Sequence, residues 1–443
     1  MDFTFSEGKM TKEVLRNYLS RAVSFQGLCV ENTTKDALFE EDLRMIKRIG
    51  AKFIGRTAFY SWGGNLTYEQ IEYHFKTAAQ QAKRAHEIDS ELILQAGVFE
   101  IMFEGTVNST PIPKWVLKEF AQEEVERNFS FDKMLPPEGS KFGRGYWGGM
   151  TDAAVPYIGS VETQMYTYYL ICQYIDAGFE AVHLGQVEFI TNLDDNQLPN
   201  WDLVLTKARA YAKEHARRGV VLFDGHKELN SSNFKIGDRM MFDHYACGAV
   251  THETEVVDGA ECAQMLHYKD RSVSWIGRTP GGIHPFGFYM DKAFTIAEFD
   301  NFNGTCGVGV PHTITYDDVF CWGYDMITWF ATQPEWYRNQ YLLECDKFLK
   351  SVELDNEGNQ TYFMQHACRR VICPEKDDRP IIKFNVGKGF DINSLDELFK
   401  TEEIKWEFDE DTGELTMTQE KESFYRANYR SEACVTGSSQ EDT

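Results

Sequence analysis

Short apolar runs alternate with amphipathic segments from about residue 20 to residue 300. The runs cover residues 22–27, 52–56, 91–100, 178–190, 220–226, 239–245 and 293–300. Between the first two runs, Leu38, Leu43, Ile46 and Ile49 recur at helical spacing before Gly50, a common helix stop. Buried parallel strands are continuous apolar runs, whereas the helices that cover them have one apolar face. The pattern therefore predicts strands and helices in alternation around a parallel sheet.

The number of these units favours closure of the sheet into a barrel. Seven strand candidates precede residue 301, and an eighth has two possible positions, 319–330 and 362–368. We favour 362–368, because the apolar pattern that starts at 319 continues with helical spacing to about residue 350. The sequence therefore predicts an α/β fold, a (β/α)8 TIM barrel.

Three segments depart from this alternation. Residues 105–158 contain PIPKW, LPPEG and GRGYWGG, which predict a long loop insertion after the third strand. The catalytic barrel is expected over 1–375, and a small C-terminal β-containing extension over 376–430 with a hairpin at 404–417. Residues 431–443 are rich in Ser, Gly, Glu and Thr and predict a flexible tail.

Composition and charge restrict the partners. The net charge of −24 opposes binding to phosphate backbones and to anionic membranes, so neither nucleic acid nor a membrane is expected. A small neutral carbohydrate is compatible with that charge, and the aromatic content of 14% suits stacking surfaces as well as a large core. Ten Cys without a Cys-x-x-Cys motif, and an N-terminus without a signal-peptide core, predict a cytoplasmic protein. A homo-oligomer remains open.

Two glutamates occupy the ends of predicted strands. Glu188 lies in the run 178–190, with an amphipathic helix before it and a helix led by Trp201 after it. Glu298 lies in the run 293–300. In a parallel barrel the C-terminal ends of all strands meet at one mouth, so the two carboxylates are expected to converge. Hydrolysis of a glycosidic bond needs such a pair.

This arrangement resembles the (β/α)8 glycoside hydrolases whose catalytic glutamates follow strands four and seven. Strand four in that clan typically ends in Asn-Glu, and a Trp-containing segment and a helix follow. Here Gln186-Val187-Glu188 precedes Trp201, so the polar residue stands two positions before the glutamate. The resemblance implies that Glu188 is the acid/base and Glu298 the nucleophile of a retaining enzyme. The two carboxyl groups would then lie about 5–5.5 Å apart.

Other polar and aromatic residues on the same predicted face are assigned to substrate binding. They are Arg56, Trp62, Asn65, Glu100, Gln186, Asp224, His226, Asp243, His244, Trp275, Arg278 and Trp322. Acidic residues and His bind sugar hydroxyls through charge-assisted hydrogen bonds, and Trp stacks on sugar rings. Glu100, after the third strand, could replace either member of the catalytic pair. His183, inside the fourth strand, is interpreted as a buried core residue.

Two other functions remain open. Asp224, His226 and Asp243 could coordinate a divalent ion in a metal-dependent sugar isomerase, epimerase or lyase, although no His-x-His or His-Glu-x-x-His motif occurs. A non-catalytic carbohydrate-binding barrel would keep the aromatic face without the chemistry. Because P-loop, nucleophile-elbow and dinucleotide-loop motifs are absent, we predict a glycoside hydrolase with no cofactor and no bound metal.

Overall fold

A computed structural model of the chain defines the fold. It describes residues 1–5, 8–25, 27–29, 38–59, 65–140, 145, 151–192, 194–226, 233–248, 252–257, 260–265, 280–298, 342, 349, 362–366, 370–373, 382–385, 406–409 and 414–417. The strand candidate at 319–330 lies outside these residues.

Parallel strands form the centre of the molecule. They are β1 (Ala22–Ser24), β2 (Phe53–Phe59), β3 (Ile93–Gly97), β6 (Ala181–His183), β7 (Leu222–Asp224), β10 (Tyr245–Gly248), β15 (Thr295–Glu298), β16 (Tyr362–Phe363) and β17 (Gln365–His366). One sheet has the order β17-β1-β2-β3-β6-β7, and another has the order β10-β15-β16. The predicted α/β fold with a parallel sheet is confirmed.

The two sheets are connected at both sides. A parallel bridge between His226 and Ala246 joins the end of β7 to β10. On the other side, only Met364 separates β16, which pairs with β15, from β17, which pairs with β1. The parallel pairings therefore lead from β1 through each neighbour in turn and back to β1. The segment that completes this path is the one favoured from the sequence for the eighth strand.

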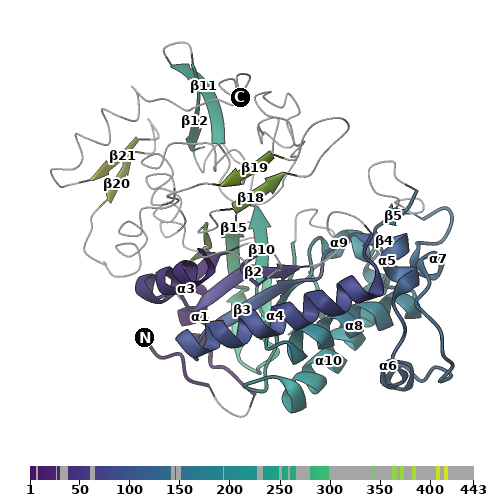
Figure 1. Cartoon of the computed structure of the whole chain (residues 1–443). Helices are drawn as coiled ribbons and strands as arrows, with labels where there is room; N and C mark the ends of the chain where they lie inside the picture. The colour runs from purple at the N-terminus through teal and green to yellow at the C-terminus, as the bar shows by residue number, and fades with distance from the viewer. Residues whose placement is uncertain are drawn as a thin grey trace.

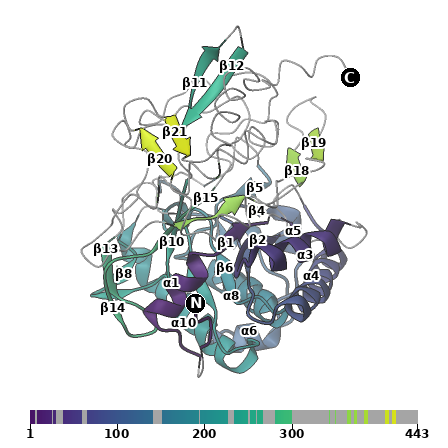
Figure 2. The ribbon, with the colours of Figure 1, turned by 90° about the vertical axis from the view of Figure 1, so that its left-hand side faces the viewer.

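Long helices cover the parallel strands. They are α1 (Lys12–Leu19), α3 (Leu38–Ile49), α4 (Tyr68–Ile88), α8 (Val161–Asp176) and α10 (Leu198–His215). Figure 1 and Figure 2 show α4, α8 and α10 side by side, and each packs on the next. A capping box between Thr67 and Gln70 starts α4, which buries Ile71, Phe75 and Ala78 on one face. Among the described helices, none combines the length and apolarity that a membrane crossing requires.

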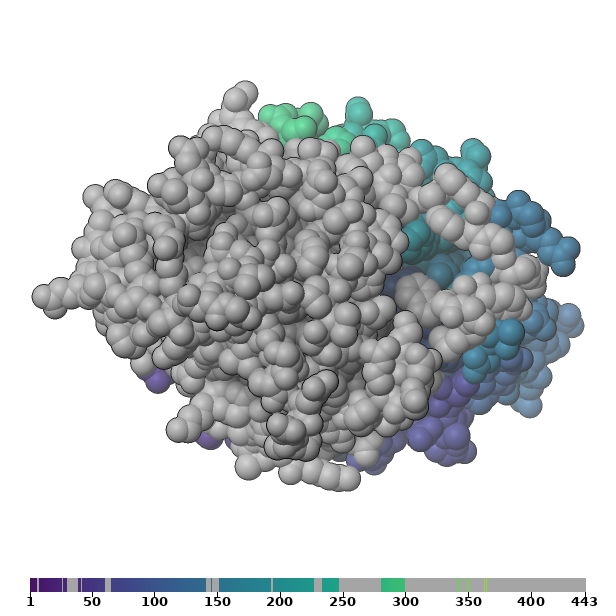
Figure 3. All heavy atoms as spheres, turned by 90° about the horizontal axis from the view of Figure 1, so that it is seen from above, coloured from purple at the N-terminus to yellow at the C-terminus, as the bar shows by residue number. Residues whose placement is uncertain are grey.

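The segment after β3 is structured. It contains β4 (Met102–Phe103), α5 (Glu104–Ser109), α6 (Lys114–Glu119), α7 (Phe131–Met134) and β5 (Ala153–Ala154). Because β4 and β5 pair antiparallel, the two ends of the segment close on each other. In Figure 3, which looks down on the molecule, its blue atoms lie along one edge. Short helices therefore replace much of the loop that the sequence predicts over 105–158.

The fourth strand is shorter than predicted. β6 ends at His183, and Glu188 lies instead in the short helix α9 (Val187–Ile190). Gly185 turns the chain with a φ of +61°, and a Cβ at this position would lie 2.1 Å from Glu100 Oε2. The apolar run continues beyond the strand because Val187 and Ile190 are buried on the helix. Continuous apolarity therefore does not separate strand from helix here.

The sixth strand was predicted over 239–245, and this position is wrong. Arg239–Met240 is β9, which pairs with β8 (Lys235–Ile236) and β13 (Pro280–Ile283) in a small separate sheet completed by β14 (Tyr289–Lys292). β10 begins only at Tyr245, so Asp243 and His244 precede this strand instead of ending it. The run is apolar because Met240, Met241 and Phe242 are buried, although they do not belong to a strand of the parallel sheets.

Further hairpins lie outside the parallel strands. They are β11 (His252–Val257) with β12 (Ala260–Met265), β18 (Arg370–Cys373) with β19 (Ile382–Asn385), and β20 (Trp406–Asp409) with β21 (Glu414–Met417). The last pair confirms the hairpin expected at 404–417. The boundaries of the barrel and of the extension remain predictions.

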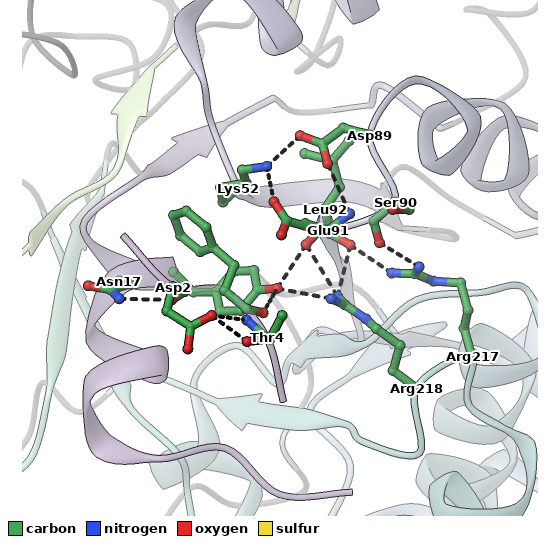
Figure 4. A network of polar contacts seen from close by, with 12 residues as sticks. Asp2, Thr4, Asn17, Lys52, Asp89, Ser90, Glu91, Leu92, Arg217 and Arg218 are labelled. Atoms are coloured by element: carbon green, nitrogen blue, oxygen red, sulfur yellow. Dashed lines mark hydrogen bonds and ion pairs between the residues drawn. The ribbon is translucent and has the colours of Figure 1, made fainter. Parts of the chain in front are cut away.

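An ion-pair network joins the segments that lead into four parallel strands. Lys52, just before β2, contacts Asp89 and Glu91 at 2.7 and 2.5 Å. Figure 4 shows these pairs, together with Arg218, which hydrogen-bonds to backbone oxygens before β3. Arg218 also pairs with the buried Glu180, just before β6. The network therefore fixes the N-terminal ends of these strands, on the face opposite their C-terminal ends.

Candidate functional site

Buried polar side chains from five parallel strands meet near the C-terminal ends of β6, β7 and β15, while Arg56 and Gln95 lie in the middle of their strands. Arg56 comes from β2, Gln95 from β3, His183 from β6, Asp224 from β7 and Glu298 from β15. Each is at most a few per cent exposed in the structure. Charged groups in such surroundings require partners, and the hydrogen bonds among these side chains supply them.

Arg56 has an unusual backbone. Its φ is +55°, and the pairing register between β2 and β3 shifts around it, between Ile54 and Ala58. The Arg56 N–H donates to Gln95 Oε1 at 3.1 Å, which holds the bulge in place. Bulges of this kind redirect a side chain. Here the guanidinium Nη2 lies 2.5 Å from Glu298 Oε1.

Glu298 is the last residue of β15, and it has a second partner. His226 Nε2 lies 3.0 Å from the same Oε1 atom. Burial raises the pKa of Glu298, but the charge of Arg56 and the hydrogen bond from His226 outweigh burial and hold it below its usual value. Glu298 is therefore an ionised carboxylate in a site nearly closed to water.

Asp224 forms the other half of the site. Its Oδ2 lies 2.8 Å from His183 Nδ1, and its Oδ1 accepts from Gln95 Nε2 at 2.7 Å. His244 Nε2 lies 3.8 Å from Oδ1. Burial raises the pKa of Asp224, but the neighbouring His183 and His244 lower it by more, so the pKa lies below its usual value. Asp224 is thus a buried anion that orients His183.

His183 is buried, as it was interpreted from the sequence, and it also contacts the polar residues of the site. Its Nδ1 is hydrogen-bonded to Asp224, and its Nε2 has no hydrogen-bond partner within the described part of the chain. The ring lies against that of His226, with centroids 4.7 Å apart. Ligand atoms of His183, His226 and Glu298 all lie within 4.8 Å of one another. These donor types differ from the Asp224, His226 and Asp243 set considered for a metal.

Glu188 is buried on α9, directly after the turn that ends β6. Two other predicted residues build this turn. Gln186 caps the helix, and its N–H donates to Glu100 Oε2 at 3.2 Å. The Glu100 carboxylate also lies against Gly185. Glu100 and Gln186 therefore position the helix that carries Glu188.

Three predicted residues have partners away from the strand ends. Asn65 Oδ1 accepts from Gly105 N at 2.6 Å and so caps α5. Asp243 Oδ2 binds Arg209 of α10 at 2.8 Å, toward the helices. His244 is buried with its ring edge-on to that of Phe53, and it also remains 3.8 Å from Asp224 Oδ1. Burial lowers the pKa of His244, and the nearby Asp224 opposes this effect.

Four predicted residues lie outside the described part of the chain. They are Trp62, Trp275, Arg278 and Trp322.

Sequence reasoning missed Gln95 and did not include His183 among the candidate site residues. Both are polar residues within short strands whose other residues are small or apolar, Ile93–Gly97 and Ala181–His183. A polar side chain in a buried strand needs a polar partner, so its presence is itself a signal for a polar centre. The sequence contains that signal, but it does not identify the partner.

The chain matches no protein-family model and no curated protein. Similar solved structures include the debranching enzyme of Nostoc punctiforme, at 12% identity over 55% of this chain and 53% of that one, with a TM-score of 0.33. An alpha-amylase from Lactobacillus plantarum has 14% identity over 52% and 53%, with a TM-score of 0.34. The glycoside hydrolase domain of PelA from Pseudomonas aeruginosa has 7% identity over 50% and 68%, with a TM-score of 0.28.

The similar structures thus include glycoside hydrolases, the class that the sequence resembles. The chain spans about half the length of the debranching enzyme and of the alpha-amylase.

Proposed function

We propose that this chain is a (β/α)8 glycoside hydrolase that uses Glu298 as its nucleophile and Glu188 as its acid/base. The ion pair between Arg56 and Glu298 is the observation that carries the proposal. A nucleophilic carboxylate must remain ionised although it is buried, and an Arg held in place by a backbone bulge meets that need. The ring of parallel pairings supports the barrel, and in a barrel the C-terminal ends of β6 and β15 lie on one face.

The reaction uses both carboxyl groups in each of two steps. In the first, Glu188 gives its proton to the departing glycosidic oxygen, while a Glu298 oxygen forms a bond to the anomeric carbon and the old C–O bond breaks. In the second, Glu188 takes a proton from water, the water oxygen bonds to the anomeric carbon, and Glu298 leaves as a carboxylate. His226, beside Glu298, stabilises the ionised form that leaves.

The remaining polar groups support this division of roles. Asp224 and Gln95 keep His183 in one orientation, with its Nε2 directed away from Asp224. Glu100 fixes the turn before α9 and thus the position of Glu188. Neutral sugar hydroxyls are suitable partners for the imidazole and carboxylate edges of such a site.

A panel of chromogenic glycosides tests the proposal, with wild type, Glu188→Gln and Glu298→Gln compared. Turnover of at least one glycoside is expected, and either substitution should lower kcat by at least about a hundredfold. Glu162→Gln is the matched control, because Glu162 is also a buried glutamate paired with an arginine, Arg127, at 2.6 Å. This variant should retain activity if it remains folded. Absence of turnover on every glycoside would favour an isomerase, a lyase or a binding protein.

A further inference from the structure

The group formed by His183, His226 and Glu298 has properties that hydrolysis does not require. The three side chains are buried, come from the ends of three strands, and have ligand atoms within 4.8 Å of one another. Two imidazoles and one carboxylate form a common donor set for zinc and related ions.

His183 is prepared as a ligand. Its Nδ1 contacts Asp224 at 2.8 Å, and Asp224 is itself held by Gln95 at 2.7 Å. A carboxylate on one ring nitrogen fixes the tautomer and leaves the other nitrogen with a lone pair for a metal. The other nitrogen, Nε2, is buried and has no hydrogen-bond partner within the residues that the structure describes. An unpaired acceptor in this position is costly unless something binds it.

His226 and Glu298 already share a cation. Their Nε2 and Oε1 atoms lie 3.0 Å apart, and Arg56 Nη2 lies 3.2 Å from the first and 2.5 Å from the second. The Nε2 atom cannot donate to Glu298 and accept from Arg56 at the same time. Because the guanidinium contacts both atoms, a metal ion bound to His226 and Glu298 would have to displace it.

We propose that His183 Nε2, His226 Nε2 and Glu298 bind a divalent transition-metal ion of the Zn²⁺ class, in competition with Arg56. Nitrogen donors favour zinc, cobalt and nickel over magnesium and calcium. Three protein ligands leave a further coordination position for water. If Glu298 is the nucleophile, as proposed above, the bound ion removes it from the reaction, and metal binding inhibits hydrolysis.

Calorimetric titration of the full chain with zinc chloride tests the site, and the absorption spectrum of added Co²⁺ reports its ligands. Wild type should bind one ion with a tetrahedral-type cobalt spectrum. His183→Phe should weaken this binding by at least about tenfold, and Asp224→Asn by about 10–100-fold, because Asp224 acts through His183. His215→Ala, which removes a half-exposed histidine on α10, is the matched control and should bind as wild type does.

Arg56→Gln gives the sharpest result, because its effect has the opposite sign. Removal of the competing guanidinium should tighten zinc binding by about tenfold, whereas a mere loss of structure would weaken it. Thermal melting of each variant verifies that it is folded. Equal binding by wild type and His183→Phe, or weaker binding by a folded Arg56→Gln, would overturn the proposal.

The two proposals fail in different ways. Hydrolysis measured in a chelator without any binding of zinc would reject the metal site and leave the hydrolase in place. Zinc binding that needs His183, in a protein that turns over no glycoside, would reject the hydrolase and leave the metal site. If both hold, zinc should inhibit wild type at the concentration at which calorimetry finds the site half occupied.

Discussion

At the scale of single residues, Arg56 is the most constrained side chain of the site. It has a left-handed backbone without being glycine, and its guanidinium is the counter-charge of Glu298. Such a backbone costs of order 1–3 kcal/mol and persists only where the surroundings enforce it. The inter-strand hydrogen bond from Arg56 N to Gln95 is one part of that enforcement.

Arg56→Gln should lower the free energy of unfolding by about 3–5 kcal/mol, because it leaves a buried carboxylate without its counter-charge. The double variant Arg56→Gln/Glu298→Gln should recover most of that loss, since no charge then remains unpaired. Urea unfolding of the wild type, both single variants and the double variant forms the cycle. Strictly additive losses would show that the two side chains are not coupled.

His284 predicts a pH dependence of stability. Its Nδ1 accepts from Phe286 N at 3.1 Å and its Nε2 contacts the Asp243 carbonyl at 3.1 Å, so both ring nitrogens are used by the neutral form. Burial lowers its pKa from 6.5 to about 4, more strongly than Asp243 raises it. At pH values between these two pKa values, His284 is protonated in the unfolded chain and neutral in the folded chain.

Stability should therefore fall as the pH is lowered from 6.5 to about 4. The contribution of His284 to this fall is about 3 kcal/mol. His284→Gln cannot take up a proton, so its unfolding free energy should fall less over the same range. Urea unfolding at several pH values compares the two proteins. Burial also lowers the pKa values of His74 and His86, but these two residues contribute equally to both proteins. Parallel curves would contradict this assignment.

At the scale of elements, the turn from β6 to α9 determines where Glu188 lies. Gly185→Ala should reduce both stability and glycoside turnover, because the added methyl group would displace the Glu100 carboxylate that accepts from Gln186 N at the start of α9. Gly139→Ala is the matched control: Gly139 has a φ of +77°, yet nothing lies within 4 Å of its added Cβ. The variants share the backbone penalty, about 1 kcal/mol, and differ in the clash. Equal turnover by both would show that this turn does not position Glu188.

The opposite ends of the strands serve stability. Glu180 precedes β6, is fully buried, and contacts Arg217 at 2.7 Å and Arg218 at 2.6 Å. Glu180→Gln should cost about 3–5 kcal/mol, because it leaves two arginines without their shared counter-ion. In the fraction that remains folded, kcat should be unchanged, since catalysis is assigned to the other face. A lower kcat per folded molecule would show that Glu180 also affects catalysis, and would contradict this assignment.

At the scale of the whole molecule, the alternation of strands and helices could be predicted because buried parallel strands are continuous apolar runs. β15 ends at Glu298 as the run around it indicates. The same signal failed at Val187, which is buried on a helix, and at 240–242, where the buried residues lie outside the parallel strands. An apolar run shows that its residues are buried, but burial alone does not determine whether they form a strand or a helix.

The candidate site could be predicted only in outline. Strand ends identified Arg56, Asp224, His226 and Glu298 as neighbours, because parallel strands finish on one face. The partners could not be predicted, since the pairing of His183 with Asp224 joins residues 41 positions apart. That contact depends on which side of each strand faces inward, and a displacement of one residue reverses the side.

The proposed covalent bond between Glu298 and a sugar is the most direct test of the central claim. A fluoro-sugar that forms a glycosyl–enzyme quickly and releases it slowly would be incubated with the protein, and the labelled peptide identified by mass spectrometry. The sugar would be the one whose chromogenic glycoside the enzyme turns over. The account predicts one sugar per chain, attached to Glu298. A label on Glu188, or steady turnover without any labelled residue, would contradict it.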